Sequence, residues 1–496
     1  MKNIDIYDIL NIQQNSMSDK KFYITTPIYY PNGIPHIGHA YTTLAADILA
    51  RYHKLKGDDV FFLTGTDEHG KKIEESAQKN GLDPKTFVDQ LIPEFKSAWE
   101  SFNIEYDRFI RTSDKDHYAV VQNILQQVYD KGDIYLGEYE GWYCTACEAY
   151  YQEKDLENKC CPIHKKEVQW LKEETYFFKL SKYQKQIKEI CESGIITPDF
   201  RKEEILNRIE EGLKDLSISR KNLKWGIPLP FDENHTCYVW FDALANYLTG
   251  IKYLESKEQF KKYWPADAHI MAKDILWFHT AIWFGILLSL DLEMPKKVVA
   301  HGFWTLEGEK ISKTTGNYIT PIEMIDIAGV DSARYYLFSS MAFGQDGDIN
   351  KAMLIEKHNS ELANNLGNLV MRTSALIEKS EIKQCENKLA KKININEIEK
   401  HFDYFELHKV LENVFSFISE CNKYIDANEI WKTKDPCELY QLADSIKIVA
   451  IILYPFMPQT CQNISKTLNF KISWDKISQA LEVSDIKKSE PLFKKI

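Results

Sequence analysis

The sequence predicts an α/β protein built on a doubly wound parallel sheet, with a small inserted module and an all-helical C-terminal region. Three observations lead to this prediction. Residues 21–70 follow the pattern strand, tight turn, helix, strand; residues 137–179 predict short strands and turns around clustered cysteines; and beyond residue 351 the apolar spacing is helical. A chain of 496 residues is too long for one core, and its 44% hydrophobic and 27% charged residues are typical of globular proteins.

The first strand is expected in the apolar, β-branched run KFYITTPIYY, residues 21–30. The turn PNGIP follows, and a helix begins at His36; the second strand, DDVFFLTG, ends just before Asp67. The carboxyl ends of parallel strands lie at one edge of a sheet, so both turns are expected to border a ligand site there. The free N–H groups at the start of the helix would suit a phosphate.

The turn PHIGH is the most specific part of this region. Gly38 allows a ligand to approach the backbone, and His36 and His39, three residues apart, can both face that ligand. An isolated pair of this kind is usually a pair of surface histidines. A second element downstream changes that interpretation: it is KISKT, which contains Lys310, Ser312 and Lys313.

A cysteine cluster predicts a structural zinc site of the Cys3His type. Cys144 and Cys147 form a CxxC pair, and Cys161 and His164 form a CxxH pair that begins fourteen residues after Cys147. Cys160 adjoins Cys161 and is an alternative ligand, but only Cys161 has the CxxH spacing. The module has little apolar sequence of its own, so its folding should depend on the metal. The remaining cysteines are expected to be small buried residues: Cys191, Cys237, Cys385, Cys421, Cys437 and Cys461.

Composition and charge indicate a soluble protein of the cytoplasm. The net charge of -11 excludes a wholly basic nucleic-acid binder, although a local basic face would still allow RNA binding. The cysteine cluster favours a reducing compartment. Residues 1–20 lack the apolar segment of a signal peptide, and the apolar run 275–290 is short for a membrane span and is expected to be a buried helix.

The rest of the chain predicts helices, strands and a bundle in turn. Helices are expected over residues 81–104 and 117–132, and the run 236–248 is strand-like. The run 296–304 is expected to be the last strand before KISKT, and everything from about residue 351 to form a helix bundle.

PHIGH and KISKT together resemble the two signatures of class I aminoacyl-tRNA synthetases. Further motifs narrow the resemblance to the methionyl-tRNA synthetase family: TTPIYYPNGIPHIGHAYTT, GTDEHG, WYCTACEAYY, DLSISR with WGIPLP, YVWFDALANY, HGFW, KISKTTGN and ELANNLGNLVMR. The similarity extends from Lys21 to the helical end. It implies a Rossmann-type catalytic domain and an anticodon-binding helix bundle.

The resemblance implies the residues that bind methionine. Ile28 would supply backbone contacts, Tyr30 and His301 would border the thioether, Trp240 would form a wall, and Asp67 would pair with the α-ammonium group. This assignment suits the ligand, because aromatic walls hold a polarizable thioether and an ammonium group needs an acceptor. Phe303 is a further aromatic residue expected at the strand ends.

The resemblance also implies the reaction. The methionine carboxylate would attack the α-phosphorus of ATP, with release of pyrophosphate, and methionyl-adenylate would then be attacked by the terminal adenosine of tRNA-Met. His36, Gly38 and His39 would bind ATP, with the histidines stabilising the developing charge. The KISKT residues Lys310, Ser312 and Lys313 would clamp the phosphates, which Mg2+ would bridge.

The helical end would bind the CAU anticodon through Asn368, Arg372 and Trp431, because splayed loop bases stack on aromatic side chains and are read by Arg and Asn. Several positions depart from the family pattern. KISKT has Ile and Thr in place of the usual Met and Ser, and Ala272 replaces a common glycine. Glu429 and Ile430 replace a usual Ala-Pro, which leaves the register of the Trp431 contact open.

The expected domain boundaries follow these assignments. They are an N-terminal extension (1–20), the first catalytic half (21–116), the connective insertion with the zinc knuckle (117–236), the second catalytic half (237–305), the KISKT and stem-contact region (306–355) and the anticodon-binding bundle (356–496). The sequence ends just past the bundle, so a monomer is expected.

Two alternatives remain. A class I synthetase for isoleucine, valine or leucine would need a large editing domain, for which the insertion is too small, and a cysteine enzyme would need zinc in its active site. A catalytically silent tRNA-binding protein would have little reason to keep both signatures and Asp67.

Overall fold

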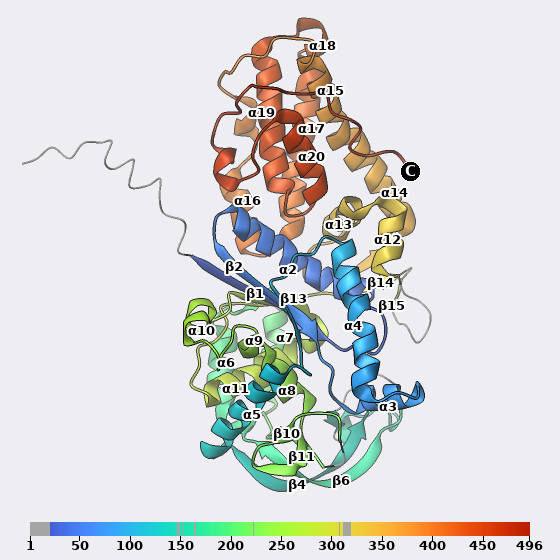
Figure 1. Ribbon diagram of the computed structural model, residues 1–496, viewed down its shortest axis with the longest axis vertical. Coiled ribbons are helices and arrows are strands. Elements are labelled where there is room, and N and C mark those ends of the chain that lie inside the picture. Colours follow the sequence, from blue (N-terminus) through green and yellow to red (C-terminus); the bar gives the residue numbers. More distant parts are fainter. Residues whose placement is uncertain are drawn as a thin grey trace, which may run out of the picture.

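The computed structural model describes residues 20–145, 149–151, 153–162, 165–221, 223–306, 308–310 and 319–496. Within them, six parallel strands form the central sheet in the order β3–β2–β1–β12–β13–β7. Figure 1 labels β1, β2 and β13 of this sheet. The strands are β1 (Lys21–Tyr29), β2 (Asp59–Thr66), β3 (Arg108–Arg111), β7 (Ile196–Thr197), β12 (Ala268–Ala272) and β13 (Val298–His301). The strand order reverses between β1 and β12, so the predicted doubly wound sheet is confirmed and its switch point lies there.

Helices cover both faces of this sheet because side chains alternate along its strands. In β1, Phe22 and Ile24 pack in the core that contains α2 (Ile37–Leu55) and α4 (Pro84–Ser101). Tyr23 lies between them in sequence and packs in the opposite core. The helices on that side are α5 (Lys115–Asp130), α9 (Asn246–Thr249) and α11 (Trp283–Ser289).

The insertion is a pair of small antiparallel sheets flanked by helices. One has the order β5–β4–β6–β8 and the other β10–β11–β9. The expectation of short strands is wrong for β4 and β6, which have 11 and 10 residues and pair continuously from Ile134 opposite Phe178 to Tyr143 opposite Gln169. The sequences of these two strands mix polar and apolar residues, which concealed their length. The elements are β4 (Ile134–Cys144), β5 (Ala149–Tyr151), β6 (Gln169–Phe178), α6 (Gln184–Glu192), α7 (Phe200–Glu210), β8 (Leu216–Ser217), β9 (Ser219–Arg220), β10 (Pro228–Leu229) and β11 (Asp232–Cys237).

The run 236–248 is mostly helical, so its interpretation as strand-like is wrong. Only its first residues belong to β11; α8 (Val239–Leu244) and α9 follow. Apart from the half-buried Trp240, every residue of α8 and α9 is buried. A segment that is buried on nearly all sides need not show a clear apolar period, which makes a helix hard to distinguish from a strand in its sequence. The expected buried helix at 275–290 is confirmed as a π-helical turn, Phe278–Ile282, continued by α11.

β13 is not the last strand before KISKT. β14 (Trp304–Leu306) and β15 (Glu309–Lys310) follow it and form a separate small sheet with β16 (Gly347–Ile349). The strands are two or three residues long, too short to show a period. α10 (Lys257–Tyr263), α12 (Pro321–Ala328) and α13 (Val330–Ser339) complete this half, and α3 (Lys71–Lys79) follows the Asp67 turn.

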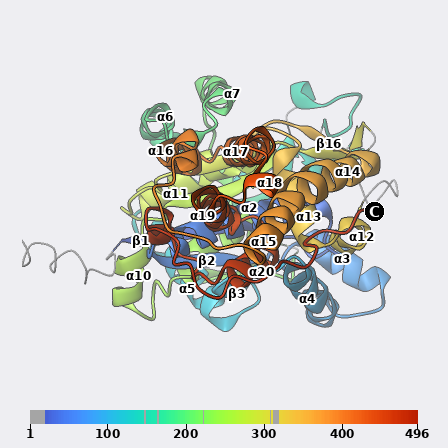
Figure 2. The same cartoon turned by 90° about the horizontal axis from the view of Figure 1, so that it is seen from above.

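The C-terminal region is the predicted helix bundle. It comprises α14 (Lys351–Lys357), the π-helical segment His358–Gly367, α15 (Asn368–Ile377), α16 (Ile395–Asp403), α17 (Leu407–Ala427), α18 (Ile430–Thr433), α19 (Pro436–Leu453) and α20 (Pro458–Leu468). It is not entirely helical, because residues 469–496 form an extended tail with one 3-10 turn at Trp474–Ile477. The tail is held along the bundle, where the Ser489 N–H donates to Ser374 Oγ at 3.0 Å. From above, the bundle helices lie over α2 and the first strands (Figure 2).

The scattered cysteines behave in two ways. Cys191, Cys237, Cys421 and Cys461 are buried thiols, as expected. Cys385 and Cys437 are instead half-buried and joined in a disulfide, which corrects the expectation for that pair. The sequence gives no sign of it, since 52 residues separate them. Across the described part of the chain, every helix is too short or too polar to cross a membrane.

Candidate functional site

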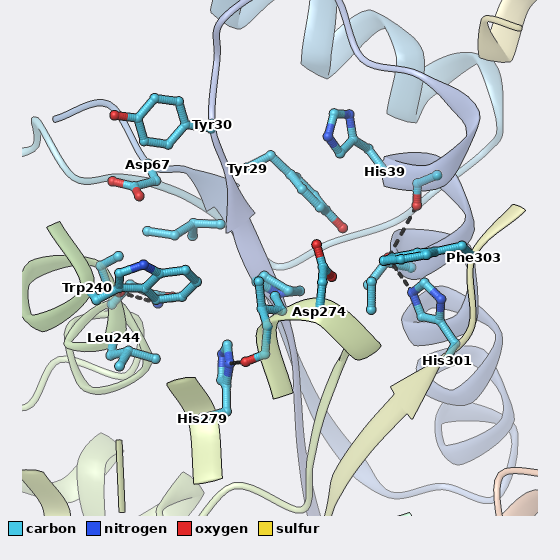
Figure 3. Close-up of a pocket in the computed structure, with 18 of the residues that line it drawn as sticks. Tyr29, Tyr30, His39, Asp67, Trp240, Leu244, Asp274, His279, His301 and Phe303 are labelled. Carbon is cyan, nitrogen blue, oxygen red and sulfur yellow. Dashed lines mark hydrogen bonds between the residues drawn. The ribbon is translucent and has the colours of Figure 1, made fainter. Parts of the chain in front are cut away.

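A cavity of about 390 Å³ opens at the switch point of the sheet, beyond the carboxyl ends of its central strands. Eight residues that the sequence predicted for ligand binding line it together: Ile28, Tyr30, His36, Gly38, His39, Asp67, Trp240 and His301. Phe303, the other expected aromatic residue, lines it as well. The cavity therefore unites the expected methionine-binding residues with the PHIGH turn. Figure 3 shows Tyr30, His39, Asp67, Trp240, His301 and Phe303 around one space.

His36 and His39 form the N-terminal cap of α2. His36 Nδ1 accepts the Gly38 N–H at 3.1 Å, His39 Nδ1 accepts the His36 N–H at 3.3 Å, and the two rings stack 3.8 Å apart. Because each Nδ1 is an acceptor, each neutral imidazole carries its proton on Nε2 and can donate it. A Cβ at position 38 would lie 2.9 Å from the His36 ring, so a side chain there would displace that ring from the cap.

One wall of the cavity consists of the α8–α9 face and the helix that follows β12. Trp240, Leu244 and Tyr247 line the cavity at helical spacing, and the Trp240 ring stacks on Phe278 with centroids 3.8 Å apart. Tyr247 and Leu244 were missed by the sequence analysis. The spacing of 240, 244 and 247 was the available signal, but it was hidden by interpreting this run as a strand.

Behind Tyr247, the buried imidazole of His279 also lines the cavity and was missed as well. Its Nδ1 lies 2.9 Å from the Ile275 carbonyl oxygen, which can only accept, and its Nε2 lies 2.7 Å from the Tyr247 hydroxyl. Nδ1 therefore carries the proton, and Nε2 accepts the hydroxyl proton. Burial lowers the pKa of His279 to about 4, so the imidazole is neutral. Asp274 is a further lining residue that the sequence analysis did not single out.

Asp67 and Tyr30 lie on the same side of the cavity as Trp240 (Figure 3). Asp67 follows β2 directly and is 8% exposed, and its N–H donates to the Tyr29 carbonyl at 2.9 Å. The Tyr30 hydroxyl donates to the His69 carbonyl at 2.8 Å. The main chain of Asp67 and the Tyr30 phenol are thus held by backbone groups around the cavity.

His301 lies on the opposite side, near His39 and Phe303 (Figure 3). Its Nε2 is 2.7 Å from the Thr42 hydroxyl on α2, and burial lowers its pKa to about 4. It is thus separated from Trp240 by the cavity, whereas His279 shares the Trp240 side. Its expected contact with the thioether stays a prediction.

The second signature is only partly described. Lys310 ends β15, and Ser312 and Lys313 lie outside the described residues. Ile319, the next described residue, accepts the Ile37 N–H at the start of α2 at 3.2 Å. The first described residue after KISKT therefore contacts the start of the helix that carries PHIGH.

The zinc prediction is likewise only partly described. Cys144 and Cys161 are buried in one small cluster with Val168, whereas Cys147 and His164 lie outside the described residues. In the described part of the chain, no three potential ligands come together as a metal-binding group. Cys160 lies beside the cluster but is half-buried.

At the far end of the bundle, α15 and α18 bring two predicted residues together. The Arg372 guanidinium lies 5.9 Å from the centre of the Trp431 ring and pairs with Asp426 at 2.8 Å. Asn368 lies one turn before Arg372 on α15 and is half-buried, and Trp431 is 42% exposed. α18 is flanked by left-handed residues, Glu429 with φ 44° and Lys434 with φ 47°.

Comparisons with known proteins match nearly the whole chain. The family model described as tRNA synthetases class I (M) matches residues 22–169 and 153–374, and the model of the anticodon-binding domain of tRNA ligase matches residues 387–494. The methionine–tRNA ligase of Clostridium tetani is 43% identical over 93% of this chain and 76% of its own length. That of Thermotoga maritima is 41% identical over 96% and 80%, and that of Nostoc sp. 40% identical over 92% of both.

Solved structures agree with the sequence relatives. Mycobacterium tuberculosis methionyl-tRNA synthetase in complex with methionyl-adenylate superposes with a TM-score of 0.92 at 33% identity, covering 96% of this chain and 99% of that one. The free form of the same enzyme superposes with a TM-score of 0.86 at 30% identity, with 96% and 98% covered. Fold, sequence and the residues around the cavity all agree, and the chain belongs to the methionyl-tRNA synthetase family of class I aminoacyl-tRNA synthetases.

Proposed function

We propose that the cavity at the switch point is where this chain, a methionine–tRNA ligase, activates methionine with ATP. The methionine carboxylate attacks the α-phosphorus, the bond to the pyrophosphate oxygen breaks, and methionyl-adenylate forms. A hydroxyl of the terminal adenosine of tRNA-Met then attacks the activated carbonyl and releases AMP. The observation that carries this proposal is the convergence of the histidine cap, Asp67 and the aromatic wall in one cavity.

The α8–α9 wall is suited to the methionine side chain. Trp240 and Leu244 offer apolar surface, and an aromatic ring holds a polarizable thioether well. Tyr247 and His279 satisfy each other's polar atoms, and His279 is uncharged at neutral pH. The wall therefore carries no charge that an apolar side chain would have to desolvate.

Asp67 is assigned to the α-ammonium group of methionine. Its carboxylate is nearly buried on the Trp240 side of the cavity, and an ion pair with an ammonium group is stronger there than in water. Ile28 lies at the end of β1, where its backbone borders the same ligand, and Tyr30 closes the wall beside Asp67.

The histidine cap is assigned to the phosphates of ATP. His36 and His39 each have a donor on Nε2, and Gly38 leaves room for the nucleotide at the start of α2. Lys310, Ser312 and Lys313 are proposed to bind the β- and γ-phosphates from the adjoining chain. Mg2+ that arrives with ATP would neutralise part of the phosphate charge beside these residues.

The bundle is assigned to the anticodon of tRNA-Met. Trp431 offers an exposed ring on which a splayed base can stack, and Arg372 and Asn368 present polar groups on the neighbouring helix. Asp426 keeps the Arg372 guanidinium extended toward the Trp431 ring.

A structural zinc ion is proposed for the insertion, held by Cys144, Cys147, Cys161 and His164. The burial of Cys144 and Cys161 in one cluster supports two of these four ligands and favours Cys161 over Cys160. The ion would supply cross-linking rather than chemistry. Cytoplasmic location and a monomeric state also remain proposals.

The test is ATP–pyrophosphate exchange with each of the twenty amino acids. We expect exchange with methionine alone, and then methionylation of tRNA-Met. Exchange with leucine, isoleucine, valine or cysteine would keep the fold and overturn the pocket assignment. An absence of exchange with every amino acid, tRNA included, would favour the silent tRNA-binding protein. Asp67→Asn should raise the KM for methionine without a matching rise for ATP, which tests the ammonium assignment separately.

A further inference from the structure

A buried cluster of one carboxylate and two imidazoles lies behind the cavity wall. Asp242 Oδ2 is 2.7 Å from His69 Nδ1, and Asp242 Oδ1 is 2.8 Å from His117 Nε2. The side chains of Asp242 and His117 are 0% exposed and that of His69 is 2% exposed. These three residues, the Asp242 cluster, do not line the cavity, so the reaction described above gives them no role.

The cluster joins the two segments that carry the methionine-binding residues. His69 lies two residues after Asp67 in the turn that follows β2, and Asp242 lies two residues after Trp240 in α8. Two positions along a helix point to nearly opposite sides, so Trp240 faces the cavity while Asp242 faces His69. Asp67 and Trp240 lie on the same side of the cavity (Figure 3), and the cluster bridges their segments from behind.

The cluster also reaches a third wall residue and two further helices. The Tyr30 hydroxyl, on the cavity wall, donates to the His69 carbonyl. His69 Nε2 lies 3.1 Å from the Tyr118 hydroxyl of α5, and His117 Nδ1 lies 3.0 Å from the Thr249 hydroxyl of α9. The imidazole of His69 is thus fixed at both nitrogens, and its backbone holds Tyr30.

The carboxylate is charged in this arrangement. Burial would raise the pKa of Asp242, but the interactions with His69 and the hydrogen bond from His117 outweigh it and lower the pKa. A buried carboxylate with two N–H donors is a directional contact, whereas apolar packing tolerates small shifts of one wall against the other. The charge and the position of Asp242 both suit it to hold the two wall segments at a fixed spacing.

We propose that Asp242 is a positioning residue for methionine: through His69 it sets the distance between the turn that carries Asp67 and the helix that carries Trp240. This inference rests on the proposed function of the cavity and deepens it. The ammonium group and the side chain of one ligand must reach both walls at once, so a small change of their spacing weakens binding of methionine more than binding of ATP. His36 and His39, on the other side, are not connected to this cluster by the contacts described.

Asp242→Asn tests the proposal because it keeps the shape and removes the charge. The amide can accept from one imidazole only, and its NH2 group faces the other. In ATP–pyrophosphate exchange we expect the KM for methionine to rise by about 10- to 100-fold, the loss typical of a buried charged hydrogen bond. The KM for ATP should change by less than about twofold. The affinity for methionine, measured by tryptophan fluorescence, should fall in parallel.

Asp133→Asn is the matched control. Asp133 is also a buried carboxylate, 1% exposed, and it accepts from Lys182 at 2.6 Å, from Ser289 at 2.8 Å and from Tyr183, away from the cavity. The Asp133→Asn variant should have a lower melting temperature and unchanged KM values for methionine and ATP. If Asp242→Asn behaves like this control, or raises both KM values together, the role is structural and the proposal is wrong.

His117→Gln gives the same test if Asp242→Asn fails to fold, because the glutamine amide can still donate to Asp242. We expect a smaller rise in the KM for methionine, about 3- to 10-fold, with that for ATP unchanged; unchanged values for both would overturn the proposal. The wild-type protein separates the two levels of inference. If the wild-type protein exchanges with another amino acid, the pocket assignment fails. Asp242→Asn still tests the positioning role in that case, because it should raise the KM for that amino acid more than the KM for ATP.

Discussion

Two buried aspartates connect different segments of this molecule through different partners. Asp242, behind the cavity, has histidine partners, whereas Asp47, in the middle of α2, has arginine partners. Both carboxylates are 0% exposed. Asp47 Oδ2 lies 2.7 Å from Arg334 Nη2 and 2.9 Å from Arg51 Nε, and its Oδ1 accepts the Glu105 N–H at 2.9 Å.

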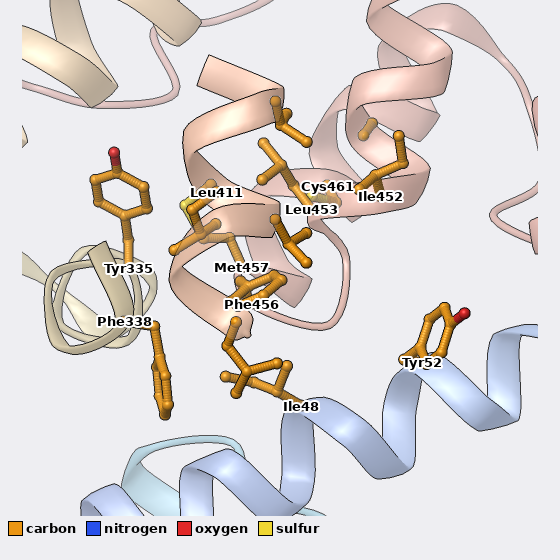
Figure 4. Close-up of a cluster of buried hydrophobic side chains, with 14 of the residues drawn as sticks. Ile48, Tyr52, Tyr335, Phe338, Leu411, Ile452, Leu453, Phe456, Met457 and Cys461 are labelled. Atoms are coloured by element: carbon orange, nitrogen blue, oxygen red, sulfur yellow. The ribbon is translucent and has the colours of Figure 1, made fainter. Parts of the chain in front are cut away.

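Arg334 connects the catalytic half to the bundle. From α13 it donates to the carbonyl groups of Phe102, which follows α4, and of Pro455 and Phe456, which join α19 to α20. Figure 4 shows the apolar part of the same interface, where Ile48 of α2 faces Phe456. A fully buried guanidinium with this many acceptors is well satisfied, but it depends on each of them.

The difference between the two sites follows from the chemistry of their partners. An arginine stays charged at every pH that a protein survives, so the Asp47 site is a permanent anchor between two domains. A histidine can lose its charge and still donate one N–H, so the Asp242 cluster fixes direction without a permanent positive charge. The first arrangement suits the joining of domains, and the second suits two pocket walls that must keep a fixed spacing.

The largest effect is expected from Arg334→Met, which removes one of the two arginine partners of Asp47 in the core. Breaking a buried ion pair on one side typically costs about 3–5 kcal/mol of unfolding free energy. Urea unfolding would measure it. The double variant Arg334→Met with Asp47→Leu removes both charges and should recover part of the loss; a single variant that costs less than about 1 kcal/mol would contradict the anchor role.

The second effect is a loss of stability in acid to which two histidines of the cavity contribute and the arginine anchor does not. Burial lowers the pKa of His279 and of His301 to about 4, so the folded state prefers their neutral forms. Their contribution is present above pH 6.5, the unfolded value, and is lost as the pH falls toward 4. At pH 5 the loss is about 2 kcal/mol per histidine. Urea unfolding from pH 7.5 to 5 should show this slope, His279→Gln should reduce it, and Arg334→Met should leave it unchanged.

A third test moves from buried partners to the exposed ring of Trp431. Stacking of one base on an aromatic side chain is worth about 1–3 kcal/mol, so Trp431→Ala should lower kcat/KM for tRNA-Met by about 10- to 100-fold. Methionine-dependent pyrophosphate exchange should not change, because the cavity is untouched. Equal losses in both assays would mean that Trp431 acts on folding rather than on the anticodon.

The smallest effect is expected from Asp426→Asn. Asp426 pairs with Arg372, but its side chain is 62% exposed, whereas those of Asp242 and Asp47 are buried. Exposed ion pairs contribute about 0–1 kcal/mol, so the unfolding free energy should barely change. A measured loss above about 2 kcal/mol would show that exposure does not explain the difference between these carboxylates.

The sequence predicted the parts of the site that lie on continuous segments. The histidine cap, Asp67 and Trp240 each lie in a short motif, and the first strand, turn and helix followed from local periodicity. Tyr247 was missed because the run 236–248 was interpreted as a strand, and His279 because the sequence of an apolar helix does not show which of its residues face a cavity. The Asp47–Arg334 pair spans 287 residues, and neither residue has a local pattern that marks a buried charge.

The backbone around α18 bears on how the bundle meets RNA. Glu429 and Lys434 enclose the four-residue helix in left-handed conformations, which cost side-chain-bearing residues on the order of 1–3 kcal/mol each. That strain exists in the free protein and is balanced by the packing of the buried Ile430 beneath. If Trp431 stacks on an anticodon base as proposed, the helix that carries its indole is already ordered in the free protein, and binding does not pay for that ordering.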